Sequence, residues 1–271
     1  MKSFRDRVAV ITGAGSGIGR ALARALFDQG AAIALVDVDE ARLREVEREL
    51  AGGGRVSVHV ADVSDRARMS ALPEEVLAHH DRVDIVINNA GVSVSSDLLD
   101  HSMEDFEWLV GINFWGVVYG CKFFLPALLR SDDAYLVNLS SMFGLIGVPS
   151  QSAYCATKFA VRGFSESIAA ELAGTPVKVL SVHPGGICTN IVRDGRYDER
   201  AKAMRPKLVR FFERHTMPPE RCAAIILQAM RRNRSRVLVT REAHLTDAAK
   251  RVFPALPQSW IERGRRLLQG R

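Results

Sequence analysis

The alternation of short β-branched runs with longer helical patterns constrains this chain more than any other feature of its sequence. Seven runs have the composition of buried strands, at residues 7–13, 32–37, 56–62, 83–91, 134–141, 177–185 and 236–240. Helical patterns lie between several of them, at residues 18–30, 40–50, 103–130, 152–173 and 219–232. Continuously apolar strands that alternate with helices indicate a parallel sheet covered on both faces. We therefore predict a three-layer, doubly wound Rossmann α/β fold with about seven parallel strands.

The rest of the chain adds no second domain to this prediction. No internal repeat, low-complexity segment or linker interrupts residues 1–271, so we expect a single domain. The opening residues lack the pattern of a signal peptide, and the longest uncharged apolar run, Trp108 to Cys121, is too short to span a bilayer. The four cysteines are far apart and show no metal-like spacing. We expect a cytoplasmic protein with reduced thiols and no metal site.

Positive charge is concentrated in the last third of the chain. Residues 191–271 contain 20 Lys and Arg against 8 Asp and Glu. Such a segment can attract anionic membranes, nucleic acid or a phosphate-bearing substrate, but no nucleic-acid-binding signature accompanies it, and a solvated arginine-rich surface is favoured. Residues 241–271 are expected to form a basic helical extension, with Trp260, Leu267 and Leu268 near one face. Packing on the same domain or on a second subunit is favoured over contact with a membrane surface.

A glycine-rich turn, Thr12 to Gly19 ("TGAGSGIG"), follows the first predicted strand and precedes a helix. Glycines allow a tight turn and a close approach to a pyrophosphate, which the positive N-terminus of a helix attracts. The spacing is neither G-x-G-x-x-G nor that of a P-loop. It therefore indicates a dinucleotide site that includes Gly13, Ser16, Gly17, Ile18 and Gly19.

An aspartate at the end of the second predicted strand bears on the choice of dinucleotide. The carboxylate of Asp37 can accept hydrogen bonds from the adenosine ribose and repels a 2′-phosphate. The alternative is that Asp37 or Asp39 merely caps the next helix. Because neither Ser16 nor Val38 supplies a cation for a phosphate, NAD is favoured over NADP.

Tyr154 and Lys158 stand four positions apart in a predicted helix, shortly after the pair Ser140–Ser141. Side chains at i and i+4 are neighbours on a helix, so an idle surface pair is one interpretation. The other interpretation is that the pair has a catalytic function. A phenol of pKa ~10 becomes a base at neutral pH if a cation at ~4 Å supplies about 4 kcal/mol, which an effective dielectric near 20 allows.

Together these features resemble the short-chain dehydrogenase/reductase family over roughly residues 6 to 240. The motifs fall in the family's order, from T-G-x-x-x-G-x-G through Asp37, "ADV" at 61–63, "NNAG" at 88–91, Asn113, a serine and Y-x-x-x-K to "PGGICT" at 184–189. The resemblance implies an enzyme that transfers hydride between a nicotinamide and a secondary alcohol or ketone.

The resemblance also implies site residues by position. Ser141 is selected over Ser140, and the catalytic set is Asn113, Ser141, Tyr154 and Lys158. Tyr154 is the general acid or base, Ser141 orients the substrate oxygen, Lys158 lowers the pKa of Tyr154 and holds the nicotinamide ribose, and Asn113 holds a water linked to Lys158. Further cofactor contacts are implied for Asp62, Val63, Asn89, Ala90, Gly91, Pro184, Gly185, Ile187 and Thr189.

The substrate pocket is expected from residues 92–96, 142–151 and 187–217, with a lid at about 190–217. Apolar residues predominate there, which favours a bulky apolar substrate, whereas arginines such as Arg193, Arg196 and Arg205 would suit an anionic tail or simply be solvated. An NADPH-dependent reductase of carbonyls or 3-oxoacyl thioesters is the alternative enzyme. A non-catalytic dinucleotide sensor is the alternative of another class. We expect a homodimer or homotetramer.

Overall fold

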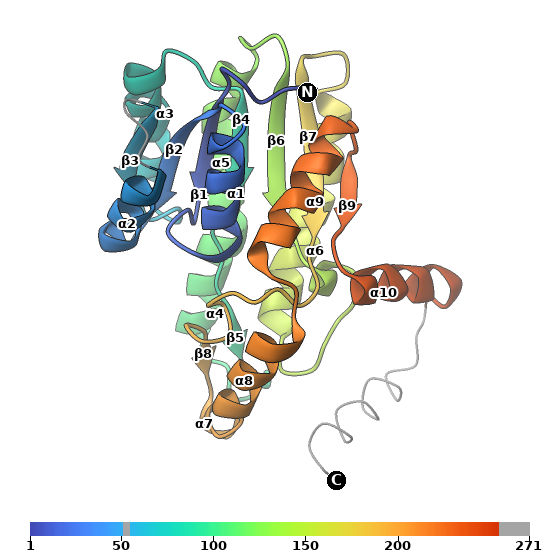
Figure 1. The fold of residues 1–271 in the computed structure, drawn as a ribbon. Coiled ribbons are helices and arrows are strands. Elements are labelled where there is room, and N and C mark those ends of the chain that lie inside the picture. Colours follow the sequence, from blue (N-terminus) through green and yellow to red (C-terminus); the bar gives the residue numbers. More distant parts are fainter. Residues whose placement is uncertain (51–54, 255–271) are drawn as a thin grey trace.

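The computed structural model describes residues 1–50 and 55–254, and a seven-stranded sheet forms its centre (Figure 1). The strands are β1 (Val8–Thr12), β2 (Ala32–Asp37), β3 (Val56–Val60), β4 (Ile85–Asn88), β6 (Ala134–Leu139), β7 (Val177–His183) and β9 (Arg236–Leu238). All neighbours pair in parallel, in the order β3-β2-β1-β4-β6-β7-β9. The predicted fold class is confirmed, and the strand order reverses between β1 and β4, where Rossmann folds bind their ligands.

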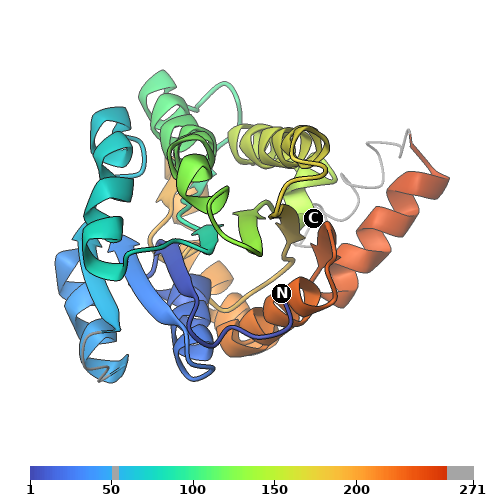
Figure 2. The ribbon, with the colours of Figure 1, turned by 90° about the horizontal axis from the view of Figure 1, so that it is seen from above.

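Two helical layers cover the sheet (Figure 2). The layers consist of α1 (Gly17–Phe27), α2 (Glu40–Leu50) and α9 (Pro219–Arg231) on one face, and α3 (Arg66–His80), α5 (Gly116–Leu128) and α6 (Ser152–Glu171) on the other. Leu26 and Ile226 join the first layer to the apolar side of the strands. Phe124 and Val161 do so in the second. The central strands are apolar throughout because both of their faces are buried.

Two features of the fold were not predicted from the sequence. Helix α3 spans a segment of mixed polar and apolar residues that includes Pro73. Asp65 caps this helix by accepting hydrogen bonds from the backbone N–H groups of Ala67 and Arg68. A second, two-stranded parallel sheet joins β5 (Val94–Ser95) to β8 (Arg196–Tyr197). This small sheet connects the segment after β4 to the predicted lid, far along the sequence.

The helix between β5 and β6 is continuous but irregular. It runs as α4 (Met103–Val110), a π-turn (Gly111–Trp115) and α5. Among the described residues, Met103–Leu128 is the one helical stretch whose length and apolar composition would allow it to cross a membrane. Because Val117, Phe124 and Leu128 pack into the core beneath the sheet, we interpret it as a core helix. This helix is not buried along its whole length, since Trp115 is 46% exposed.

The predicted lid and residues 241–252, at the start of the C-terminal extension, lie at the same end of the molecule as the carboxyl ends of the strands (Figure 1). The lid contains β8, α7 (Glu199–Lys202) and α8 (Arg205–His215). The extension begins with α10 (Arg241–Val252), which Thr240 caps by accepting a hydrogen bond from Ala243 N. The predicted apolar face at Trp260, Leu267 and Leu268 lies outside the described residues.

Candidate active site

The predicted site residues from distant parts of the chain meet at one edge of the sheet. The glycine turn follows β1, Asp37 ends β2, Asn89 follows β4, and Ser141 and Pro184 follow β6 and β7. All these strands are parallel, so their carboxyl ends lie at the same edge. Helix α6 brings Tyr154 and Lys158 to this edge, where α6 contacts the short 3₁₀ turn Met142–Gly144.

The glycine turn has the geometry of a phosphate cradle. Gly13 and Gly17 have φ of +66° and +51°, a region that favours glycine. A Cβ on Gly19 would lie 2.1 Å from the carbonyl oxygen of Gly13, and one on Gly17 would lie 3.0 Å from Thr189 Cγ2. Side chains at Gly17 and Gly19 would therefore collide with atoms that pack closely against the turn. Ser16 occupies the N-cap without a capping side-chain bond, and Ile18 packs against the core.

The "NNAG" segment supports this turn. Asn89 donates its side-chain amide to the carbonyl oxygens of Thr12 (2.9 Å) and Gly13 (3.2 Å). The hydroxyl of Thr12 accepts the backbone N–H groups of Asn89 and Ala90. A Cβ on Gly91 would lie 3.5 Å from Lys158 Nζ, so glycine keeps the backbone close to the lysine.

The two aspartates after β2 have different roles. Asp39 Oδ1 accepts the N–H of Arg42 at the start of α2, which makes it the capping residue. Asp37 Oδ2 instead accepts the N–H of Gly15 at 3.0 Å, inside the glycine turn. Asp39, and not Asp37, therefore caps α2, while the Asp37 carboxylate lies against the glycine turn.

Arg42, a cation that was not predicted from the sequence, also lies beside Asp37 and the glycine turn. The Cβ of Arg42 is 2.9 Å from where a Cβ on Gly15 would lie, and its guanidinium pairs with Asp39 (3.1 Å) and with Asp194 (3.4 Å) of the lid. The signal available in the sequence was its place in the first turn of the helix that follows Asp37. The expectation that no cation stands near Asp37 is therefore incomplete.

Asp62 and Val63 lie just after β3, beside the end of β2. The N–H of Ala61 donates to the Asp37 carbonyl, which ties the two strand ends together. Asp62 Oδ1 accepts both the N–H (2.8 Å) and the hydroxyl (2.7 Å) of Ser64. Val63 is buried against Gly116, where a Cβ would lie 2.7 Å from Val63 Cγ2.

The structure separates the two neighbouring serines. Ser140 is buried, and its hydroxyl donates to the Lys158 carbonyl at 2.8 Å. The Ser141 hydroxyl accepts the N–H of Phe143 at 3.1 Å and is hydrogen-bonded to the Tyr154 side chain. Ser141 is thus the serine that meets the tyrosine.

Tyr154 and Lys158 lie together in a dry environment. The Lys158 Nζ is 5.6 Å from the centroid of the Tyr154 ring and donates to the Leu139 carbonyl at 3.0 Å. Burial raises the pKa of Tyr154 to about 12, although the bond with Ser141 acts in the opposite direction. Burial also lowers the pKa of Lys158 to about 8. In the protein without dinucleotide, desolvation of both side chains favours their neutral forms.

Asn113 lies inside the π-turn and is fully buried. Its amide oxygen accepts the Val92 N–H at 2.8 Å, and its amide nitrogen donates to the Val92 carbonyl at 2.9 Å. The side chain therefore fixes the chain after β4 against the helix. Asn113 and Lys158 both approach Gly91, where a Cβ would lie 3.2 Å from Asn113 Oδ1 and 3.5 Å from Lys158 Nζ. The two side chains are therefore close to each other.

The turn after β7 packs against the start of the C-terminal extension. A Cβ on Gly185 would lie 2.1 Å from the hydroxyl of Thr240, and Glu242 Oε1 accepts the N–H of Gly186 at 3.0 Å. Ile187 is buried and bridges to Met217. The whole segment from Pro184 to Thr189 thus borders the glycine turn and the Ser141 loop.

Apolar side chains surround Tyr154. They come from three of the expected regions and from α4, which was not expected; the cluster contains Val92, Val94, Phe106, Trp108, Leu109, Phe143, Ala153 and Ile191. Phe143 meets the Tyr154 ring edge-on with centroids 6.1 Å apart. The reacting centre is therefore enclosed mainly by apolar groups.

The lid arginines have partners within the protein. Arg193 pairs with Glu213, and Arg205 donates to the Arg193 carbonyl. Arg196 pairs with Asp105 at 2.5 Å and lies 3.7 Å over the Trp108 ring centroid. All three side chains thus have partners within the protein, although those of Arg193 and Arg196 remain 55% and 43% exposed.

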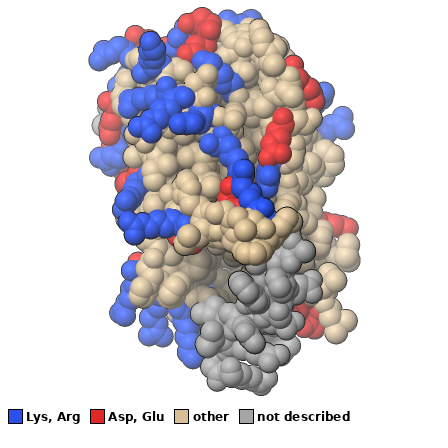
Figure 3. Space-filling model, turned by 90° about the vertical axis from the view of Figure 1, so that its right-hand side faces the viewer, with Lys and Arg blue, Asp and Glu red and all other residues tan. Residues whose placement is uncertain are grey.

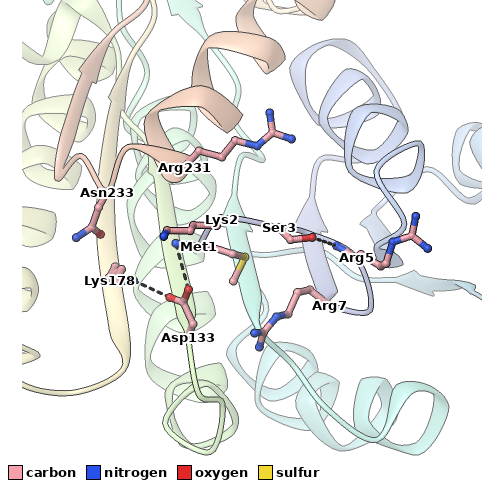
Figure 4. A pocket seen from close by; sticks show the side chains of 9 residues that line it. All are labelled: Met1, Lys2, Ser3, Arg5, Arg7, Asp133, Lys178, Arg231 and Asn233. Carbon is pink, nitrogen blue, oxygen red and sulfur yellow. Dashed lines mark hydrogen bonds and ion pairs between the residues drawn. The ribbon is translucent and has the colours of Figure 1, made fainter.

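Basic residues also gather away from the site. Figure 3 shows Lys and Arg side chains clustered on the upper part of one face. A hollow of about 550 Å³ opens at the amino ends of the strands (Figure 4). There Lys178 pairs with Asp133 at 2.7 Å, and Arg7 pairs with Asp84 and Asp132. Two of its cations are therefore paired with carboxylates, and these pairs tie the strand ends together.

The fold and this site define a class of dinucleotide-dependent oxidoreductases. The family model for short chain dehydrogenases matches residues 7–200, and the chain belongs to the short-chain dehydrogenase/reductase family. This confirms the resemblance in the sequence.

Individual relatives agree with that membership. "Putative oxidoreductase SadH" of Mycobacterium tuberculosis is 41% identical over 269 residues, 97% of each chain. A short-chain dehydrogenase/reductase of Burkholderia phymatum, solved in complex with NAD, has a TM-score of 0.87 at 30% identity and covers 93% of this chain and 95% of its own. Levodione reductase has a TM-score of 0.80 at 28% identity, with 90% and 99% covered. The chain is thus an oxidoreductase of a family that uses nicotinamide dinucleotides.

Proposed function

We propose that the protein is an NAD-dependent oxidoreductase that interconverts a bulky, apolar secondary alcohol and its ketone. The observation that carries this proposal is the joining of Tyr154 to Ser141, with Lys158 one turn away, at the sheet edge that also holds the glycine cradle. A bound nicotinamide supplies the acceptor or donor of hydride. Tyr154 takes the hydroxyl proton in oxidation and returns it in reduction, while Ser141 hydrogen-bonds the substrate oxygen.

The electrostatics set a condition on this chemistry. Bringing the pKa of Tyr154 from about 12 to ~7 needs roughly 7 kcal/mol. The Lys158 ammonium, 5.6 Å from the ring centroid, provides about 3 kcal/mol at an effective dielectric near 20. Lys158 thus supplies part of this free energy, and a bound oxidised nicotinamide would add a second positive charge beside the ring. We therefore expect Tyr154 to act as a base in the complex with oxidised dinucleotide.

An NADPH-dependent reductase of carbonyls or thioesters is the second candidate. The observation in its favour is Arg42, whose side chain starts beside Gly15 and Asp37. Asp37 faces the same corner and repels a 2′-phosphate, so NAD remains our proposal.

We also propose that the protein forms a homodimer or homotetramer through the α5 and α6 side of the molecule. Trp115, Tyr119 and Phe123 stack in a row along one side of this helix, with centroids 5.8 Å apart at each step. Trp115 is 46% exposed and Phe159 of α6 is 41% exposed. A second copy would cover this aromatic row, and sedimentation of the wild type against Trp115→Glu tests it. The four free cysteines support a reducing, cytoplasmic location.

The decisive experiment follows nicotinamide absorbance with a panel of secondary alcohols and ketones and with both dinucleotides. Wild-type protein should turn over at least one apolar substrate with NAD(H). Tyr154→Phe should bind NADH normally and lose nearly all turnover, whereas Tyr119→Phe, a tyrosine of the aromatic row, serves as the matched control. Turnover retained by Tyr154→Phe overturns the catalytic assignment, and a wild type that is silent across the panel favours the sensor alternative.

A further inference from the structure

His183, the last residue of β7, lies directly behind the reactive serine. It is fully buried, with Nδ1 3.1 Å from the Ser141 carbonyl oxygen and Nε2 3.0 Å from the Ser181 hydroxyl. A carbonyl only accepts, so Nδ1 carries the hydrogen and Nε2 accepts from Ser181. Burial lowers the pKa of His183 to about 4, so the ring is neutral at physiological pH and this tautomer is fixed.

The backbone around Ser141 is held from both sides by the end of β7. The Ser141 carbonyl accepts from His183 and from the N–H of Gly144 at 2.9 Å. The next N–H, of Met142, donates to the Pro184 carbonyl at 2.7 Å. On its other side, the His183 carbonyl accepts the N–H of Val239 at 3.2 Å, beyond the end of β9. One residue thus links the ends of three strands at the site.

We propose that His183 is a positioning residue that fixes the Ser141 hydroxyl relative to Tyr154 and to the turn beginning at Pro184. This inference rests on the proposed function, because it assigns Ser141 to the substrate oxygen. His183 has no exposed surface and does not touch substrate, so it acts through Ser141. The effect is on the rate, since a misplacement of about 1 Å in a reacting group costs up to ~100-fold.

Two variants of His183, to asparagine and to glutamine, distinguish a positioning role from a purely packing role. The side-chain nitrogen of asparagine takes the place of histidine Nδ1 and keeps the donor to the Ser141 carbonyl. The nitrogen of glutamine takes the place of Nε2, near Ser181, and leaves that carbonyl with the N–H of Gly144 as its remaining donor. We expect His183→Asn to keep kcat within about threefold of wild type and His183→Gln to lose about tenfold or more, with NADH affinity unchanged in both.

The measurements are kcat, KM, the Kd of NADH from its fluorescence, and thermal unfolding of all three proteins. Equal kcat in the two variants, whether retained or lost, overturns the proposal, as does a loss that appears only in NADH affinity or in folding. A wild type without turnover on any alcohol or ketone overturns the proposed function and this inference with it. An active wild type with equal variants overturns the role of His183 alone.

Discussion

Replacing each of the two adjacent serines by alanine tests the assignment of the site most directly. Ser141 contacts Tyr154 at the open side of the loop, whereas the Ser140 hydroxyl points into the protein and donates to the Lys158 carbonyl. The two substitutions remove the same atom from consecutive residues. They differ in whether that atom faces the reacting centre.

The expected magnitudes follow from these contacts. Ser141→Ala removes a donor to the oxygen that becomes charged in the transition state, and such a loss lowers kcat by about 10²–10³, or roughly 3–4 kcal/mol. Ser140→Ala removes one neutral hydrogen bond to a carbonyl inside α6, which costs about 1 kcal/mol of the free energy of unfolding. We therefore expect a catalytic defect in the first variant and a small stability defect in the second.

The assays are steady-state kinetics with the best substrate of the panel, NADH titration, and urea unfolding of both variants. NADH affinity should be unchanged in each. A kcat in Ser140→Ala that falls as far as in Ser141→Ala would refute the reasoning, and so would a Ser141→Ala enzyme with kcat near that of wild type.

Three other predictions extend the test. Asp37→Ser should raise kcat/KM with NADP relative to NAD by about tenfold because Arg42 stays beside the corner, and adding Arg42→Ala should cancel the gain. Gly19→Ala should abolish NADH binding, since its Cβ would lie 2.1 Å from a carbonyl, while Gly163→Ala in α6, with open space around it, should not. His183 should make the protein less stable in acid, because its pKa is about 4 in the folded state and ~6.5 in the unfolded state. The free energy of unfolding should therefore fall by about 1 kcal/mol between pH ~6.5 and pH ~5.5. Urea unfolding at both pH values should show a smaller drop in His183→Asn, and an equal drop contradicts this cause.

The resemblance to the family identified residues whose chemical setting the sequence did not show. Tyr154 and Lys158 are one helical turn apart in the sequence and in the structure, yet burial raises the pKa of Tyr154 and lowers that of Lys158. The environment decides here, because desolvation depends on what packs around a group and not on its neighbours in the chain.

Local sequence patterns were sufficient to predict the fold class. Strand and helix periods, the glycine spacing from Gly13 to Gly19 and the four-residue step from Tyr154 to Lys158 are properties of consecutive residues, so the sequence alone predicts them. Helix α3 was not predicted because Pro73 interrupts its pattern, although its buried residues Met69, Leu72 and Val76 keep a helical spacing.

Tertiary structure alone decided the features that join distant segments. It placed Arg42 of α2 beside Gly15 and against Asp194 of the lid, and it gave the lid arginines their partners. It also set His183 behind Ser141, 42 residues away in the chain. Such contacts depend on how strands and helices pack, which no local period records. The sequence by itself thus determines the family and its reactive groups, including Ser141, whereas packing determines which cation and which histidine stand beside them.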